Sequence, residues 1–260
     1  MIFYWGELDS VLRGGVVDRT ASLREVLQQA DSITCLTGAG ISVESGIPTF
    51  RGPGGLWRNF SPEKLATPEA FADDPRLVWE WYDWRRGLIK KAEPNPGHQG
   101  LAELERRQAL KKEAASFTLI TQNVDGLHDR AGSRNTVKLH GDIWRTGCTG
   151  CGRVESNERV PLEPLPPRCP CGAVLRPAVV WFGEPLPPAE WSRALEASAR
   201  ATILLVVGTS AAVYPAAGLT QVARGAGAKI AVVNPEPTPL DHIADWVLRG
   251  QSGELLPRLL

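Results

Sequence analysis

Residues 32–42, with the sequence SITCLTGAGIS, carry the pattern that indicates the fold of this chain. The apolar run Ser32–Thr37 leads directly into Gly38-Ala39-Gly40, as expected for a buried strand that ends in a glycine turn. In nucleotide-binding proteins such a turn lets the backbone approach a pyrophosphate, which the N-terminus of the next helix binds. By itself the motif is weak, because Val43 stands where a complete G-x-G-x-x-G pattern has its third glycine. A tight strand-to-helix turn without a ligand explains the same residues equally well.

Predicted strands and helices alternate on both sides of this turn. The predicted strands are the apolar runs at 32–37, 117–121, 179–182, 203–207 and 229–233. The predicted helices lie at about 22–30, 76–91, 98–112, 188–199 and 215–226. This alternation is typical of a parallel sheet with helices on both faces, so we expect an α/β fold.

Two pairs of cysteines lie in the stretch 144–178, which is rich in Pro, Gly and Arg and has no clear period. The pairs are Cys148/Cys151 and Cys169/Cys171, and their spacing predicts a tetrahedral four-cysteine zinc site rather than four unrelated thiols. Four thiolates leave no open position for water, which indicates a structural zinc ion. The second pair is one residue shorter than the usual C-x-x-C, so its geometry must differ.

The length and composition of the chain limit the number of domains and the kinds of partner that we expect. The chain has 260 residues, 29 basic and 29 acidic side chains, and 43% hydrophobic residues. This is enough for one large domain, or for one domain with an insertion. Zero net charge argues against bulk attraction to nucleic acid or to a membrane surface. No apolar run is long enough to span a bilayer, and the first residues do not have the pattern of a signal peptide. The unevenly spaced cysteines suggest a reducing compartment. We therefore expect a cytoplasmic protein.

Two polar segments follow predicted strands and are candidates for binding and catalysis. Gln122–His128 (QNVDGLH) offers amide and carboxylate groups that can hold ribose hydroxyls and a carboxamide. In Lys138–Gly141 (KLHG), His140 is a candidate general base, because imidazole titrates near neutral pH. The other histidines are expected to be structural (His98), to brace a loop (His128) or to lie on the surface (His242).

The order of the motifs resembles that of the sirtuins, which are NAD-dependent protein-lysine deacylases. The matching segments are TGAGIS (37–42), GIPTFRG (46–52), TQNVDGLH (121–128), LHG (139–141), the cysteine pairs, VVWFGE (179–184), GTS (208–210) and VNPE (233–236). The resemblance runs from about residue 36 to 257. It implies a Rossmann-like NAD-binding domain made of 1–50, 96–143 and 179–260. It also implies a small domain made of a helical insertion, 51–95, and a zinc module, 144–178.

The resemblance also implies roles for individual residues. It assigns catalysis to His140 and Asn123. The implied NAD contacts are Gly38, Ala39, Gly40, Phe50, Arg51, Trp57, Gln122, Asn123, Val124, Asp125, Gly208, Thr209, Ser210, Asn234, Pro235, Glu236 and Ser252. The implied peptide-binding strand is Val180, Trp181, Phe182, Gly183 and Glu184, which would pair with the substrate backbone.

The family chemistry consumes NAD and needs no help from zinc. The acyl-lysine carbonyl oxygen attacks the ribose carbon as nicotinamide leaves, and His140 then deprotonates a ribose hydroxyl, which attacks the resulting imidate. Water completes the release of lysine and O-acyl-ADP-ribose, while Phe50 shields the reacting ribose. The expected partners are acyl-lysine proteins or peptides, and a monomer suffices for this reaction.

One pair of residues indicates a subclass. Tyr82 and Arg85 lie one helical turn apart, as in sirtuins that prefer succinyl-lysine and malonyl-lysine, and Ala66 matches the small residue of their roomy acyl pocket. A guanidinium can bind a carboxylate with two parallel hydrogen bonds, and a phenol can add a third. The alternative is that Arg85, next to Arg86, lies on a solvated helix face. Trp79, Trp81 and Trp84 of the same helix are expected in the core or in a groove wall.

Three other functions use some of the same residues. Mono-ADP-ribosyl transfer or NAD hydrolysis would keep the cofactor, but His140 and the segment VVWFGE favour deacylation. An NAD-binding regulator without activity would be supported by loss of His140 or of 122–125, and both are present. A hydride-transferring dehydrogenase would need the complete G-x-G-x-x-G pattern.

Overall fold

The computed structural model describes residues 18–50, 55–56, 59–111 and 115–260. Its larger sheet has six parallel strands in the order β3-β2-β1-β7-β8-β9. The strands are β1 (Ser32–Thr37), β2 (Ser116–Thr121), β3 (Thr136–Lys138), β7 (Ile203–Val207), β8 (Lys229–Val233) and β9 (Trp246–Leu248). The predicted bounds of β1, β7 and β8 are confirmed, and so is the parallel α/β sheet.

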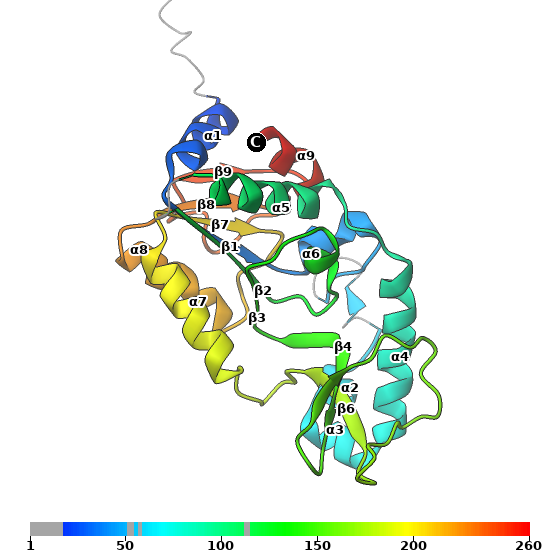
Figure 1. Ribbon diagram of the computed structural model, residues 1–260. Coiled ribbons are helices and arrows are strands. Elements are labelled where there is room, and N and C mark those ends of the chain that lie inside the picture. The colour runs from blue at the N-terminus through cyan, green and yellow to red at the C-terminus, as the bar shows by residue number, and fades with distance from the viewer. Residues whose placement is uncertain (1–17, 51–54, 57–58, 112–114) are drawn as a thin grey trace, which may run out of the picture.

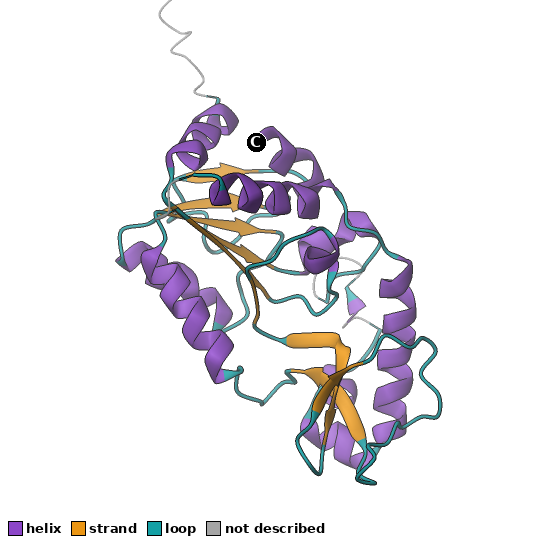
Figure 2. Ribbon diagram, viewed as in Figure 1, coloured by secondary structure: helices purple, strands orange, loops and turns teal. Residues whose placement is uncertain are grey.

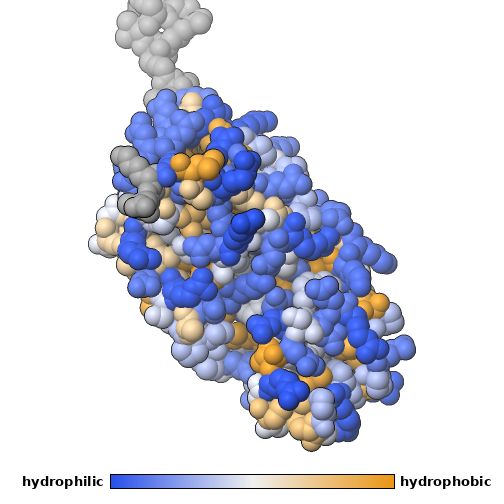
Figure 3. All heavy atoms as spheres, in the orientation of Figure 1, coloured by the Kyte–Doolittle hydropathy of each residue, from blue (hydrophilic) through white to orange (hydrophobic). Residues whose placement is uncertain are grey.

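Helices cover both faces of this sheet (Figure 1). One face carries α1 (Arg19–Gln29), α5 (Pro96–Ala109) and α9 (Ser252–Arg258), and the other carries α7 (Pro188–Arg200) and α8 (Leu219–Gly225). Successive strand side chains point to opposite faces, so Cys35 packs among the first group of helices and Leu36 among the second. Both cores are almost wholly aliphatic, and the outer face seen in Figure 3 is mostly hydrophilic.

The direction of the chain across the sheet reverses between β1 and β7. From β1 the strands continue to β2 and β3 on one side, whereas β7, β8 and β9 follow on the other side. The loops after β1 and β7 therefore diverge and leave a crevice at the carboxyl ends of the strands, where open α/β sheets bind their ligands. The segment after β1 forms a 3₁₀ helix, η1 (Ala39–Ser45), instead of an α-helix.

A second, smaller unit lies at one end of the molecule (Figures 1 and 2). Its antiparallel sheet has the order β5-β4-β6, with β4 (Gly141–Cys148) between β5 (Val154–Ser156) and β6 (Leu175–Val179). Three helices, α2 (Pro62–Leu65), α3 (Pro68–Asp73) and α4 (Pro75–Lys91), share a hydrophobic cluster with β4 and β6. A short helix, α6 (Leu127–Arg130), follows the turn after β2.

Two expectations about elements were wrong, and one region holds strands that were not predicted. The strand predicted at 179–182 ends at Val179 and belongs to the small antiparallel sheet, because the backbone after it turns to meet other loops. The stretch 144–178 holds parts of three short strands, although its sequence shows no period. The helix predicted at 215–226 is divided into a 3₁₀ turn, η3 (Ala216–Gly218), and α8. Among the residues described, no helix is long and apolar enough to cross a membrane.

Candidate active site

A cavity of about 860 Å³ opens at the carboxyl ends of the parallel strands. Four predicted segments meet in its wall: 38–40 after β1, 122–124 after β2, 208–210 after β7 and 234–236 after β8. His140 and 180–184 line it between the two sheets, and Phe50 lines it together with Ala66, Tyr82 and Arg85 of the helical insertion. The fold thus gathers most of the proposed NAD, peptide and acyl contacts around one space.

The glycines after β1 are required by another turn of the protein. A Cβ at Gly40 would lie 2.6 Å from the carbonyl oxygen of Gly208, and a Cβ at Gly38 would lie 2.7 Å from the Cβ of Thr209. Gly208 itself has φ +57°, and its Cβ would lie 2.3 Å from the nitrogen of Ile41. The turns after β1 and β7 therefore touch through their backbones, and this contact forms one wall of the cavity.

His140 presents one ring nitrogen to the cavity. Its Nδ1 lies 3.0 Å from the carbonyl oxygen of Gln122, and because a carbonyl can only accept, Nδ1 carries the proton. Nε2 is then the basic nitrogen. Burial lowers the pKa of His140, against a smaller upward effect of the bond to Gln122. The imidazole is therefore neutral near pH 7 and able to accept a proton.

A buried network fixes the loop after β2. The Asn123 amide donates to the carbonyl of Gly38 (3.1 Å) and to Ser42 Oγ (3.3 Å). Ser42 in turn donates to Asp125 Oδ2 at 2.8 Å, while the N–H of Leu127 donates to Oδ1. Burial raises the pKa of Asp125. Asp125 lies behind the cavity wall in this structure, so the contact with a carboxamide remains a prediction.

Two further histidines lie beneath this network. His98 Nδ1 accepts from the N–H of Asn95 within a capping box at the start of α5, and its Nε2 lies 3.4 Å from Ser42 Oγ. His128 Nε2 lies 3.0 Å from Thr37 Oγ1. The two rings contact edge to face, and burial lowers the pKa of both. The roles of Ser42 and Thr37 were not predicted individually, although Ser42 is part of the glycine motif.

Arg85 is a buried cation in the cavity wall. Its side chain is 5% exposed, and its guanidinium lies 4.4 Å from the ring centroid of Phe50 and 5.1 Å from that of Trp81. Within the described part of the chain it forms no hydrogen bond or ion pair. Burial lowers its pKa to about 10, so the group is still charged at neutral pH. The solvated helix face is therefore wrong for Arg85, and also for Arg86, which is fully buried.

Tyr82 and Ala66 lie beside Arg85 in the same wall. The Tyr82 hydroxyl oxygen accepts a 2.9 Å hydrogen bond from the indole N–H of Trp181. Burial raises the pKa of Tyr82 to about 12, which keeps the phenol protonated. Ala66 is buried, and its carbonyl accepts from the N–H of Phe182.

The proposed peptide-binding segment is a turn in this structure. The N–H groups of Val180 and Phe182 donate to His140 and Ala66, both at 2.9 Å. The N–H of Trp181 donates to the carboxylate of Glu184, whose own N–H donates to the Trp181 carbonyl. Gly183 has the one N–H of 180–184 without a hydrogen bond to a described residue. The expectation of a continuous strand here was wrong.

Some predicted residues lie elsewhere, and some cavity residues were not predicted. Ser252 begins α9 instead of lying in a loop, donates to Glu44 at 3.1 Å, and is not part of the cavity wall, which Gln251 lines instead. Arg51 and Trp57 lie outside the described residues. The cavity residues that were not assigned a role are Val43, Pro48, Thr49, Val179, Leu186, Val213, Tyr214, Pro215, Pro237 and Gln251. Most are near neighbours of a recognised motif, which is the signal that could have found them.

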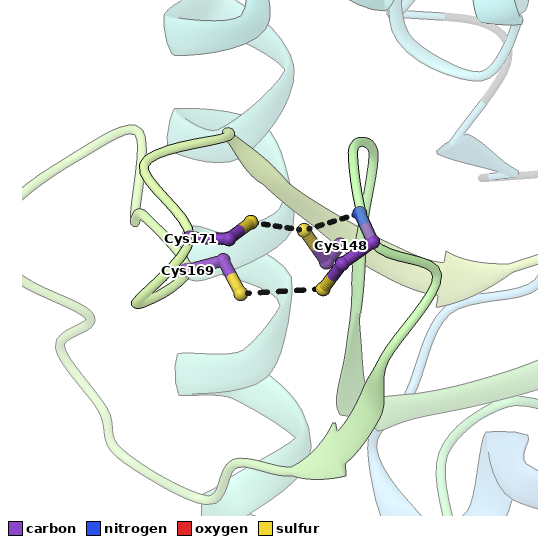
Figure 4. Close-up of side chains that lie close together, drawn as sticks. Cys148, Cys169 and Cys171 are labelled. Carbon is purple, nitrogen blue, oxygen red and sulfur yellow. Dashed lines mark hydrogen bonds between the residues drawn. The ribbon is translucent and has the colours of Figure 1, made fainter.

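The four cysteines of the small unit converge on one point (Figure 4). Their sulfur atoms all lie within 4.8 Å of one another, with Cys148–Cys171 at 3.4 Å and Cys151–Cys169 at 3.8 Å. A tetrahedral zinc ion with bonds of about 2.3 Å needs sulfur atoms about 3.8 Å apart, so the donor set fits zinc. The N–H groups of Cys151 and Gly150 point at Cys148 Sγ, and they help to lower the pKa of Cys148 to about 6. This favours the thiolate at Cys148, whereas burial and the neighbouring sulfur atoms raise the pKa of Cys169 to about 12.

Comparison with known proteins gives one consistent family. The model of the Sir2 family matches residues 38–215. NAD-dependent protein deacylase 2 of Pyrobaculum aerophilum is 52% identical over 240 residues, which is 92% of this chain and 94% of that protein. The NAD-dependent protein deacylase of Aquifex aeolicus is 57% identical over 229 residues, 88% of this chain and 93% of that protein. A crystal structure of a Sir2 homolog–NAD complex superposes with a TM-score of 0.84 at 48% identity, covering 92% and 91% of the two chains.

Proposed function

Because the chain belongs to the Sir2 family of NAD-dependent protein deacylases, we propose that it removes succinyl and malonyl groups from protein lysine side chains, and acetyl groups as well. NAD and zinc are its cofactors. The residues that meet at the sheet edge would hold NAD, and the four cysteines would hold zinc. When bound, NAD would supply the activated bond between ribose and nicotinamide, which breaks as nicotinamide leaves, and its ribose would receive the acyl group.

The preference for acidic acyl groups rests on Arg85. A buried guanidinium is unfavourable unless an anion pairs with it, and no described carboxylate forms an ion pair with Arg85, which only attracts Asp125 at longer range. A carboxylate at the end of a succinyl or malonyl chain would pair with both terminal nitrogens, and the Tyr82 hydroxyl would add a hydrogen bond. Ala66 leaves room for such a chain beside them.

The remaining residues position the reactants and exclude water. His140 Nε2 is the group that accepts a proton in the cavity, because Nδ1 is held by Gln122. Phe50 packs over Arg85 and closes that side of the cavity. The N–H of Gly183 remains available to a peptide backbone, which would lie along 180–184.

The test compares matched peptides that carry acetyl-lysine or succinyl-lysine, with mass spectrometry of the peptide and nucleotide products. We expect kcat/KM to be at least about tenfold higher for the succinyl peptide, and Arg85→Met to lower that value by about 10- to 100-fold, the range for a hydrogen bond to a charged group. His140→Ala should abolish turnover of both peptides. Arg145→Met is the control, because Arg145 is exposed on β4 and away from the cavity.

Two results would contradict the proposal. An acetyl preference that Arg85→Met leaves unchanged would remove the acidic acyl specificity and keep the general deacylase. Release of nicotinamide with neither peptide deacylated would favour mono-ADP-ribosyl transfer or NAD hydrolysis.

A further inference from the structure

The Tyr82 hydroxyl accepts one hydrogen bond but donates none to a described residue. The oxygen accepts from Trp181 Nε1, and an indole N–H can only donate, so the phenol proton is not used in this contact. No described residue accepts that proton. The hydroxyl lies in the cavity wall beside Arg85, where an incoming anion would meet it.

Trp181 is itself held rigidly on three sides. Its indole is 3% exposed and packs against the ring of Phe71, with centroids 5.2 Å apart. The guanidinium of Arg176 covers the indole face at 3.6 Å from the ring centroid. The backbone N–H of Trp181 donates to Glu184 Oε2 at 2.8 Å. An amphipathic ring fixed in this way has one orientation for its N–H.

Arg176 and Glu184 form the support for this ring. Two guanidinium nitrogens of Arg176 donate to the two oxygens of Glu184 at 2.6 and 2.8 Å, and one of them also donates to the carbonyl of Val179. Such a bidentate pair is geometrically specific, because two parallel bonds fix the plane of the guanidinium. Arg176 lies on β6 of the small sheet, whereas Tyr82 lies on α4. The pair thus connects the zinc module to the acyl pocket.

We propose that Trp181 is a specificity-determining positioning residue, and that the Arg176–Glu184 pair acts through it. The indole N–H occupies the Tyr82 oxygen and directs the phenol proton toward the acyl carboxylate that Arg85 binds. Glu184, which the sequence assigned to the peptide, serves the acyl pocket instead through its side chain. This inference rests on the proposed preference for acidic acyl groups.

The test measures kcat and KM for the succinyl and acetyl peptides, together with binding of fluorescent versions of both peptides by anisotropy. The readout is the ratio of the two KM values, since a general structural defect would affect both peptides alike. In Trp181→Phe, which keeps an aromatic ring but removes the N–H, we expect the preference for succinyl to fall about five- to tenfold. Arg176→Met should lower it by a similar factor, and Arg176→Lys should restore part of it.

Combined variants show whether the residues act through one another. When Trp181→Phe is added to Tyr82→Phe, we expect the succinyl preference to fall by less than a further factor of about two. The same should hold when Arg176→Met is added to Trp181→Phe, because the two substitutions of each pair would remove the same hydrogen bond. Arg145→Met is the matched control, and zinc content and melting temperature verify that each variant is folded.

The outcomes separate this inference from the function on which it rests. If Arg85→Met and Tyr82→Phe lower the succinyl preference while Trp181→Phe and Arg176→Met leave it within twofold, Trp181 has no positioning role and the proposed function stands. If Arg85→Met leaves the preference unchanged, both the acidic acyl function and the role of Trp181 are overturned. Additive losses in the double variants would also contradict a path through Trp181.

Discussion

His140 determines how the activity responds to acid. Its Nδ1 is fixed to the Gln122 carbonyl, so only Nε2 can take up a proton, and a protonated imidazole is no longer a base. Burial lowers its pKa below the ordinary value of 6.5. We therefore expect the acid-side decline of kcat/KM to have its midpoint below pH 6.5, as a pH profile from 8 to 4.5 would show. The exposed His242 provides a control, since His242→Gln should keep the same profile. An inflection above pH 7 would argue against this assignment.

The buried His98 and His128 make the stability of the fold depend on pH. Their folded-state pKa values lie below 6.5, so their contribution to stability is complete above that pH and is lost as the pH falls below it. For His98, whose pKa is lowered to about 4, the loss at pH 5 is about 2 kcal/mol. Urea unfolding at pH 7.5 and pH 5 should show this decrease, and His98→Asn should reduce it. An equal decrease in that variant would assign the effect to other groups.

At the scale of elements, local patterns predicted the parallel sheet well and the small unit poorly. The runs that form β1, β7 and β8 are buried on both faces, so their apolar sequences alone mark their ends. The run 179–182 is equally apolar, but Trp181 is buried among α3, α4 and β6, and its backbone turns. The ends of β4 and β6 meet at a small cluster that contains Cys148, Cys169 and Leu175. Long-range contacts decide both regions, and neither has a local period.

In the candidate active site, too, contacts between residues far apart in the sequence could not be predicted from local patterns. Motifs after strand ends identified the loops that line the cavity, whereas the sequence could not show that Arg85 is buried without an anionic partner in the described structure. It also could not show that Glu184 pairs with Arg176, eight residues before it, because that contact depends on the turn at 180–184.

The contact between the turns after β1 and β7 can be tested by adding a single methyl group. Gly40→Ala would place a Cβ 2.6 Å from the backbone oxygen of Gly208, and neither backbone can move without disturbing its strand. We expect a decrease of about 1–3 kcal/mol in the free energy of unfolding, measured with urea, and weaker NAD binding by calorimetry. Gly225→Ala is the control, because a Cβ there meets no atom of a described residue within 4 Å. Similar stability of the two variants would mean that the turns separate easily.

At the scale of the whole molecule, hydrogen bonds join α4 to the zinc module. The buried Trp79 donates from its indole N–H to the carbonyl of Leu175 at 2.7 Å. Arg86 donates to the carbonyl of Arg159, and Asp83 accepts from the N–H of Leu162 at 2.8 Å. The helix that carries Tyr82 and Arg85 is therefore attached to β6 and to the loop 157–162, both of which contain residues of the zinc module. A metal without a chemical role would in this way control the acyl pocket.

Removal of zinc should therefore abolish deacylation while the large sheet remains folded. After chelation, or in Cys169→Ser, we expect faster hydrogen exchange in β4, β6 and α4, and unchanged protection in β1, β7 and β8, whose cores do not include the small unit. Mass spectrometry of exchanged peptides measures this directly. Cys35→Ala is the matched control, because Cys35 is buried in the large sheet and should keep zinc, activity and protection of α4. If α4 stayed protected and the enzyme active without metal, the hydrophobic cluster shared by α2–α4 and β4 would be sufficient to hold the acyl pocket, and the cysteine site would stabilise only its own loops.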